Sequence, residues 1–170
     1  MTSPLQPILE SSCARATSAA EMRYRINRPI AERKGVRVIA LDDGARAIIE
    51  WLSPQPRGHT RFLSVAELEA DAGERGSVSL RDTDGTVSSL TDELAEADVV
   101  VIVATTDADA AATSIIGAAS TLRAIMTAAV VVGEGAAASQ TVAVLRPHAR
   151  SLVVSVHEED VSDLLTALRA

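Results

Sequence analysis

Short apolar runs alternate with helix-like segments along most of this chain, and that alternation constrains its fold more than any other feature. The runs are rich in valine and isoleucine and lie at 36–41, 60–65, 98–105, 128–133 and 151–156. Strands that are apolar on both faces belong to parallel sheets covered by helices on both sides. The sequence therefore predicts an α/β fold with a doubly wound, mostly parallel sheet of five or six strands.

Helical periodicity fills the intervals between the runs. After the first run, apolar residues recur at the spacing of one helix face, at Ala45, Ile48, Ile49 and Leu52. Further helices are predicted over 91–97, 107–123 and 136–146, and a last one that begins at Glu158. The segment 76–90 reads as another strand, or as a hairpin that turns at Thr83-Asp84-Gly85.

Residues 1–35 do not share this rhythm. The segment is polar, contains Pro4, Pro7 and Pro29, and carries several arginines. We expect an N-terminal arm over 1–35 and a single α/β domain over 36–170. Two interpretations of the arm stay open, an ordered segment lying on its own domain or a neighbouring subunit and a flexible tail.

Composition narrows the classes of partner. The net charge is −7 and aromatic residues make up 2% of the 170 residues. A negative chain with so few stacking side chains is poorly suited to nucleic acid. No stretch approaches the ~20 apolar residues that cross a bilayer, and the N-terminus does not read as a secretory signal. With Cys13 as the sole cysteine, we expect a cytoplasmic protein without an internal disulfide.

Four acids follow the two strands that we expect to be neighbours at the centre of the sheet. They are Asp42 and Asp43 after the first strand, and Asp107 and Asp109 after the strand 98–105. Ligands of such sheets bind where the strand order reverses, beyond the carboxyl ends of the strands. One interpretation is a site for Mg²⁺ or Ca²⁺; the other is that these acids cap the helices that begin there.

The same loops bear on nucleotide binding. Gly44, Thr105 and Thr106 are candidate ligand-binding residues there, but the loop after the first strand lacks the remaining glycines of a dinucleotide fingerprint. Acids at a helix N-terminus also repel a phosphate that would bind there. A phosphate would therefore need a bridging metal ion at this edge of the sheet.

A glycine pair occurs later in the chain. Gly133 and Gly135 fall in a G-x-G-x-x-A spacing between a strand and a helix, without an acidic residue placed to bind a ribose. The pattern indicates a tight turn, and the two glycines are also candidate ligand-binding positions.

Two further patterns contain residue types that occur in catalytic or metal sites. The segment 81–87, RDTDGTV, resembles the nucleophile loop of haloacid-dehalogenase phosphatases, with Asp82 as nucleophile and Asp84 as acid and base. That family also needs a downstream Lys or Arg and a second acidic pair, but the sole lysine, Lys34, lies upstream and the acidic segment 157–163 is predicted to start a helix. A turn is the alternative. His59, His148 and His157 show no metal-ligand spacing, which favours surface or capping roles.

Several stretches together resemble the GTPase domain of the FtsZ/tubulin family. They are GVRVIALDDGARAIIEWL, HTRFLSV and ELAEADVVVIVATTDADAAATSIIGAASTLRAIMTAAVVV, within about residues 35–132. The departures fall on the phosphate loops, because the glycine clusters expected at 42–45 and 105–111 read DDGA and TTDADAA. The resemblance implies a shortened relative that has lost GTP hydrolysis, with no room for the family's C-terminal domain.

Three functions follow from these patterns. The first is a non-catalytic FtsZ-like or Rossmann-like protein that acts by protein–protein association, as a homo-oligomer or accessory subunit, through the arm and helix 107–123. The second is a divalent-metal-dependent domain that binds a nucleotide or phosphorylated metabolite at the four acids. The third is an atypical dinucleotide-binding domain. The patterns favour a protein that is not an enzyme. They assign no cofactor, and Mg²⁺ and a nucleotide are the candidates.

Overall fold

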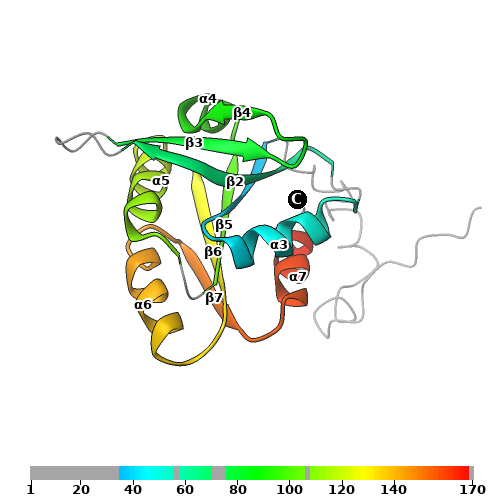
Figure 1. Ribbon diagram of the computed structural model, residues 1–170, viewed down its shortest axis with the longest axis vertical. Helices are drawn as coiled ribbons and strands as arrows, with labels where there is room; N and C mark the ends of the chain where they lie inside the picture. The colour runs from blue at the N-terminus through cyan, green and yellow to red at the C-terminus, as the bar shows by residue number, and fades with distance from the viewer. Residues whose placement is uncertain (1–34, 56–57, 70–75, 106–107, 169–170) are drawn as a thin grey trace, which may run out of the picture. The chain divides into compact units, whose positions relative to one another are not determined.

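The computed structural model describes residues 35–55, 58–69, 76–105 and 108–168. Within these ranges the chain forms seven strands and five helices (Figure 1). The elements in chain order are β1 (Val36–Ala40), α3 (Asp43–Leu52), β2 (Thr60–Glu69), β3 (Ser77–Asp82), β4 (Val87–Ser89), α4 (Leu90–Ala95), β5 (Val99–Ala104), α5 (Ala110–Leu122), β6 (Met126–Val132), α6 (Gly135–Leu145), β7 (Ser151–Ser155) and α7 (Glu159–Leu168).

The strands form one sheet in the order β4-β3-β2-β1-β5-β6-β7. The five strands from β2 to β7 in that order are parallel, whereas β3 and β4 pair antiparallel. The predicted α/β fold with a mostly parallel sheet is confirmed. The sheet has seven strands rather than five or six, because the turn at Gly85 divides the segment 76–90 into the hairpin of β3 and β4.

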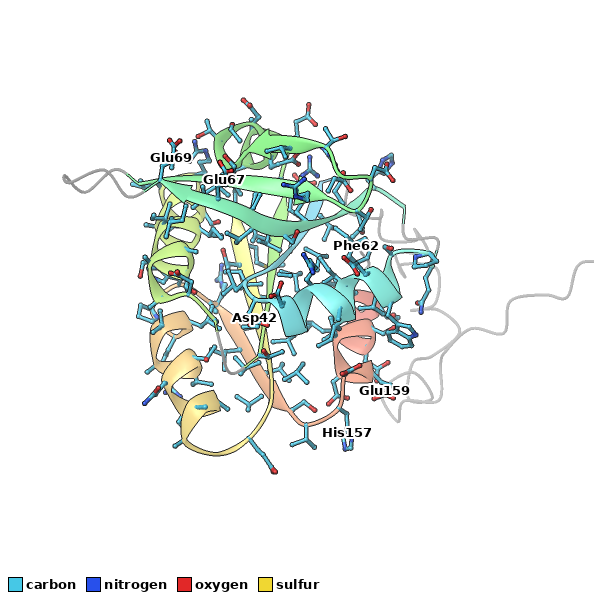
Figure 2. The ribbon with its side chains drawn as sticks, viewed as in Figure 1. Asp42, Phe62, Glu67, Glu69, His157 and Glu159 are labelled. Atoms are coloured by element: carbon cyan, nitrogen blue, oxygen red, sulfur yellow. The ribbon has the colours of Figure 1, made fainter. Side chains whose placement is uncertain are left out.

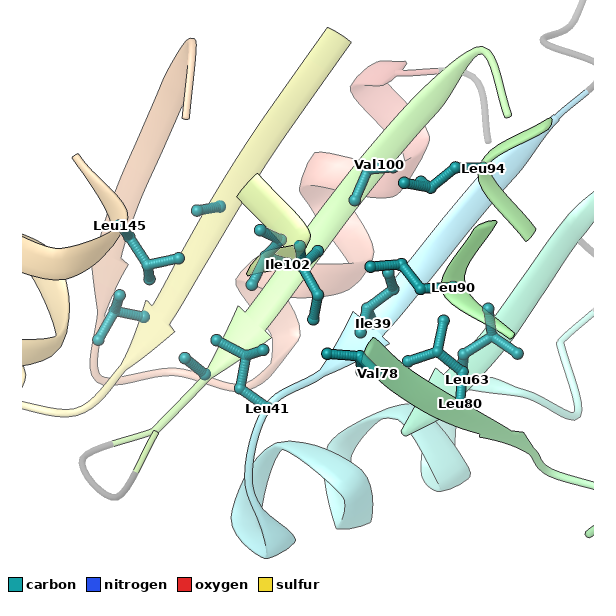
Figure 3. Packing of buried hydrophobic residues seen from close by; sticks show 14 of the residues in the cluster. Ile39, Leu41, Leu63, Val78, Leu80, Leu90, Leu94, Val100, Ile102 and Leu145 are labelled. Carbon is teal, nitrogen blue, oxygen red and sulfur yellow. The ribbon is translucent and has the colours of Figure 1, made fainter. Parts of the chain in front are cut away.

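Helices cover both faces of the sheet, as expected. On one face lie α3 and α7; on the other lie α4, α5 and α6, with α5 and α6 side by side (Figure 1). Each face has its own cluster of buried side chains. The cluster beneath α4, α5 and α6 is aliphatic, and in it Leu90 lies beside Ile39 and Leu94 beside Val100 (Figure 3). Core burial of this kind is the main force that holds helices onto a sheet.

The strand order places a switch point between β1 and β5. Strand β1 pairs with β2 on one side and with β5 on the other, so the chain leaves the two central strands in opposite directions across the sheet. The carboxyl ends of β1 and β5 lie side by side, as the sequence predicts, and ligands of doubly wound sheets bind at this place.

The two edges of the sheet differ. On one side, β4 is three residues long and follows directly from the hairpin. On the other side, β7 has five residues and pairs with β6.

Among the described residues, no helix is long and apolar enough to span a membrane. The N-terminal arm predicted over 1–35 lies outside the described residues except for Gly35.

Candidate functional site

Asp42 joins the two central strands at the switch point. It follows β1 in an extended conformation and is the N-cap of α3, at whose start Figure 2 shows it. Its Oδ1 accepts hydrogen bonds from the Ala45 N–H at 2.8 Å and the Thr105 hydroxyl at 2.7 Å. Its Oδ2 accepts from the Thr105 N–H at 2.7 Å. One carboxylate therefore caps a helix and ties it to the end of β5, an arrangement that we call the Asp42 clamp.

Gly44 allows this close approach. A Cβ atom at Gly44 would lie 2.9 Å from Thr105 Cγ2 and 3.0 Å from Thr105 Oγ1. These distances are shorter than ordinary van der Waals contacts, so the first turn of α3 packs directly on the Thr105 side chain. Because Gly44 has no side chain, the Thr105 side chain fits against the first turn of α3.

The clamp uses the groups that would bind an anion. The N-terminus of a helix carries a partial positive charge and free N–H donors, and it commonly binds phosphate. Here the carboxylate of Asp42 lies against the first turn of α3 and accepts the Ala45 N–H. The protein thus supplies its own anion at the switch point.

The other predicted acids have separate surroundings. Asp43 has a side chain that is 95% exposed and lies 3.6 Å from the guanidinium of Arg46. Asp109 is the N-cap of α5, and its Oδ1 accepts from the N–H groups of Ala111 and Ala112 at 2.7 and 3.0 Å. Thr106 and Asp107 lie outside the described residues.

These contacts bear on the two interpretations of the acids. Asp42 and Asp109 both make the capping bonds that the capping interpretation expects. Within the described ranges, no group of three histidine, cysteine or acidic residues is placed to hold a metal ion. Since Asp107 is not described, the predicted four-acid metal site stays a prediction.

A small hollow lies beside the clamp. It has a volume of about 350 Å³ and opens between the carboxyl end of β1 and the middle of β2. Its polar lining comes from Asp43, Arg46 and Ser64 together with Asp42. An ammonium or guanidinium group, or a metal-bound phosphate, matches this mixed lining better than a bare anion does.

Gly133 and Gly135 form a tight turn between β6 and α6. Their φ angles are 152° and 79°, values that glycine adopts without the steric cost of a side chain. Glu134 is the N-cap residue of α6, but its side chain makes no capping bond. The tight-turn interpretation fits these angles, and the candidate role in ligand binding stays a prediction.

This turn closes one end of a larger groove. The groove has a volume of about 950 Å³ and runs between α6 and β7. Its lining is mostly apolar, with one basic side chain, and includes Ala138, Val142, Val154, Val156 and Arg146. We call it the α6–β7 groove. The two glycines can be recognised in the sequence by their spacing, but the groove cannot. Its walls come from α6 and β7, and neither segment contains a ligand-binding motif of its own.

A buried cluster of ion pairs lies at the opposite end of the sheet. Arg37 on β1 and Glu93 on α4 are 4% and 3% exposed, and Arg37 Nε donates to Glu93 Oε2 at 2.7 Å. Arg61 on β2 donates through Nη1 to Glu93 Oε1 at 2.7 Å and through Nη2 to Asp82 Oδ2 at 2.6 Å. The hydroxyl of Ser88 also donates to Glu93. The cluster links four strands to α4.

This cluster is not evident from the sequence as a whole. The only signal for it is Arg37, a charged residue inside the apolar run VRVIAL, which asks for a buried acidic partner. Its partner Glu93 lies in an acidic helical segment that looks solvent-exposed in sequence.

The cluster changes how Asp82 is understood. Burial by itself raises the pKa of Asp82, but hydrogen bonds from Arg61 and Thr83 outweigh burial and lower that pKa below its ordinary value of 3.8. The same hydrogen bond raises the pKa of Arg61. The Asp82 N–H donates to Thr86 O and the Gly85 N–H to Asp82 O. These bonds are those of a hairpin turn, the alternative to the phosphatase loop.

His148 has a packing role. A Cβ atom at Gly117 on α5 would lie 2.2 Å from His148 Cγ. The imidazole therefore occupies the space left by that glycine, beside the contact between α5 and α6.

Comparisons with known proteins give little further guidance. No family model matches the sequence, and no curated protein matches it. Two crystal structures of proximal thread matrix protein 1 from the mussel byssus are similar, one with a zinc-occupied MIDAS motif and one in a second crystal form. Each has 12% identity and a TM-score of 0.39, with 79% of this chain matching 44% of that chain. A likeness of this size assigns neither a family nor a function.

Proposed function

We propose that this chain is a small non-catalytic FtsZ-like or Rossmann-like protein that acts through protein–protein association, as a homo-oligomer or an accessory subunit. In this proposal its GTP-binding loops are degenerate. The observation that carries it is the Asp42 clamp, because a carboxylate of the protein occupies the switch point where α/β proteins of this class bind an anionic ligand.

The clamp opposes a nucleotide in two ways. A phosphate group near the start of α3 would lie close to the negative charge of Asp42, and like charges at such distances repel. The donors it needs are also in use, since Ala45 N–H and Thr105 N–H already bond to Asp42. Nucleotide would have to break the helix cap in order to bind.

The surface supports association. The helix α5 is apolar around most of its circumference, and its last residue, Leu122, is 86% exposed. Helices that are apolar on every side are usually buried against another surface. The exposed outer positions of α5 also include Ala111 and Ala118, which leave a partner free to approach closely. Helix 107–123 is the contact element that the sequence predicts.

Thermal unfolding with added ligands tests the proposal. The melting temperature of the full chain would be measured alone, with Mg²⁺, with GTP and with Mg²⁺ and GTP together. A ligand at a hundred times its dissociation constant stabilises a protein by about 2.7 kcal/mol, which is easily seen. We expect no change with any addition. A reproducible rise with Mg²⁺ and GTP would overturn the proposal.

A metal-dependent binding domain is the second candidate. The hollow lined by Asp43, Arg46 and Ser64 favours it, because a metal ion there would complete a site for a phosphorylated ligand. In that case Mg²⁺ would raise the melting temperature. D43N should reduce the rise if the metal ion lies in the hollow, and the double variant D107N/D109N should reduce it if the metal ion lies at the predicted four-acid site. If the acids only cap helices, that variant loses little stability, since Asn is also a good N-cap.

The α6–β7 groove supports the third candidate function, that of an atypical dinucleotide-binding domain. Its volume lies within the range of small-molecule sites, about 300–1,000 Å³, and Gly133 and Gly135 lie at one end. Isothermal calorimetry with nicotinamide and flavin dinucleotides tests this role directly. Heat of binding that disappears in G135V would support it.

A further inference from the structure

We propose that β7 is the interface through which two copies of this chain associate. In this arrangement the two β7 strands pair antiparallel about a two-fold axis at Val153, so that one sheet continues from copy to copy. This inference rests on the proposed function, of which it names the surface and the partner.

The outer edge of β7 has free backbone groups. Within the described residues, β7 pairs with β6 alone. The Gly133 N–H donates to the Ser155 carbonyl oxygen at 2.8 Å, which directs the backbone groups of Ser155 toward β6. Because successive residues of a strand turn their backbone groups to opposite sides and the register with β6 is unbroken, the N–H and C=O groups of Leu152 and Val154 point toward the free edge. An antiparallel partner centred on Val153 would satisfy them.

This edge lacks the features that normally prevent pairing. Proteins protect edge strands with charged side chains, proline, bulges or very short strands. The sequence of β7, SLVVS, contains no charge and no proline, and its pairing with β6 shows no shift in register. The opposite edge strand, β4, has only three residues. The two edges are therefore unequal, and β7 is the one open to pairing.

Exposed apolar side chains lie along the same edge. Val154 and Val156 are 51% and 56% exposed, and both line the α6–β7 groove. Leu152 lies on the same face of the strand and packs on the cluster beneath α6. In the proposed register, Leu152 lies opposite Val154 of the second copy. Pairing would thus bury the valines and close the outer side of both grooves.

The charges at the two ends of β7 select a second copy as the partner. Arg150 precedes the strand and Glu158 follows it. Neither side chain has an ion-pair partner in the described part of the chain. Antiparallel pairing places Arg150 of each copy opposite Val156 of the other, two residues before its Glu158. Parallel pairing would instead bring like charges together, so the strand is complementary to itself under a two-fold axis.

Sedimentation velocity of the full chain over a range of concentrations tests the interface. We expect a species of twice 17.8 kDa for the wild type. V154K places an ammonium group on the exposed face of β7 and should raise the dimer dissociation constant by at least about tenfold. The matched control is V87K on the opposite edge strand, where Val87 is 52% exposed; it should dimerise like the wild type.

A charge exchange tests the register. R150E and E158R should each weaken the dimer, because each brings like charges together, and the double variant R150E/E158R should restore it. Circular dichroism checks that every variant is folded.

The outcomes separate this inference from the proposed function. A dimer that V154K leaves unchanged would overturn the β7 interface while association through another surface, such as α5, survives. A wild type that stays monomeric at every concentration would also overturn it. The proposed function fails on a different result, stabilisation by Mg²⁺ and GTP.

Discussion

At the scale of single residues, two neighbouring acids have different roles. Asp42 accepts three hydrogen bonds from α3 and the end of β5, whereas Asp43 is almost fully exposed. In sequence the two are equivalent candidates for a cap or a metal ligand. The difference arises because the extended residue before a helix directs its side chain at the first turn, while the next residue points outward.

This difference predicts unequal effects on stability. D42A removes a helix cap and two bonds to Thr105, and should lower the free energy of unfolding by about 2–4 kcal/mol. D42N keeps an acceptor for the cap but loses one acceptor facing Thr105, so its effect should be intermediate. D43A should change stability by less than about 0.5 kcal/mol. Urea unfolding measures all three, and equal losses in D42A and D43A would contradict the clamp.

A second prediction at the scale of single residues concerns Gly44. Alanine normally stabilises a helix relative to glycine, but here its Cβ would lie 2.9 Å from Thr105 Cγ2. G44A should therefore destabilise the protein by about 1–3 kcal/mol, the usual cost of overpacking. T105S deletes the Cγ2 atom and keeps the hydroxyl, so G44A should cost less in a T105S background. A double-mutant cycle from chemical denaturation gives this coupling, and a coupling of zero would argue against the contact.

Asp82 predicts a dependence of stability on pH. Its folded-state pKa is lowered by Arg61 and Thr83, so the charged form contributes stability that is fully present above about pH 5. That stability is lost as the pH falls below 3.8 toward the folded-state pKa. D82N should therefore show a shallower loss of stability between about pH 5 and pH 3. Asp84 lies in the same turn, and D84N serves as the control that should follow the wild type.

At the scale of elements, the ion-pair cluster fixes α4 to the sheet. E93A leaves the guanidinium of Arg37 buried without its main partner, and should destabilise the protein by about 3–5 kcal/mol. Glu96 lies 3.5 Å from the same guanidinium but is 82% exposed. E96A should therefore cost less than about 1 kcal/mol. Thermal and urea unfolding would measure the loss of stability in E93A and E96A. Equal losses in the two variants would contradict a buried cluster.

The elements show how far sequence reasoning reaches. Strands β1, β5 and β6 follow directly from runs of β-branched residues, and their order places Asp42 beside the end of β5. The bond between Asp42 and Thr105 joins residues 63 positions apart, and no local pattern signals it. The pairing of Arg37 with Glu93 could not be predicted from sequence for the same reason. The acidic helix looks solvent-exposed in sequence, and its carboxylate is buried only once the hairpin of β3 and β4 lies beside it.

At the scale of the whole molecule, the sheet should open from its edges inward. Amides of β1 and β5, buried at its centre, should exchange with deuterium most slowly. In the proposed dimer, the Leu152 and Val154 amides are protected as well, and their exchange should slow as the protein concentration rises. Exchange in β4 should not depend on concentration. Mass spectrometry of exchanged peptides reads both, and β7 exchange that is independent of concentration would contradict pairing.

The inequality of the two sheet edges also limits how large an assembly can grow. A contact that uses the same patch on both copies is satisfied once two copies meet, whereas a filament needs two different surfaces that fit each other head to tail. Pairing through β7 consumes the open edge of each copy and leaves the three-residue β4 facing outward. Association of this kind is self-terminating: light scattering should reach a plateau as the protein is concentrated, rather than rise as a polymer lengthens.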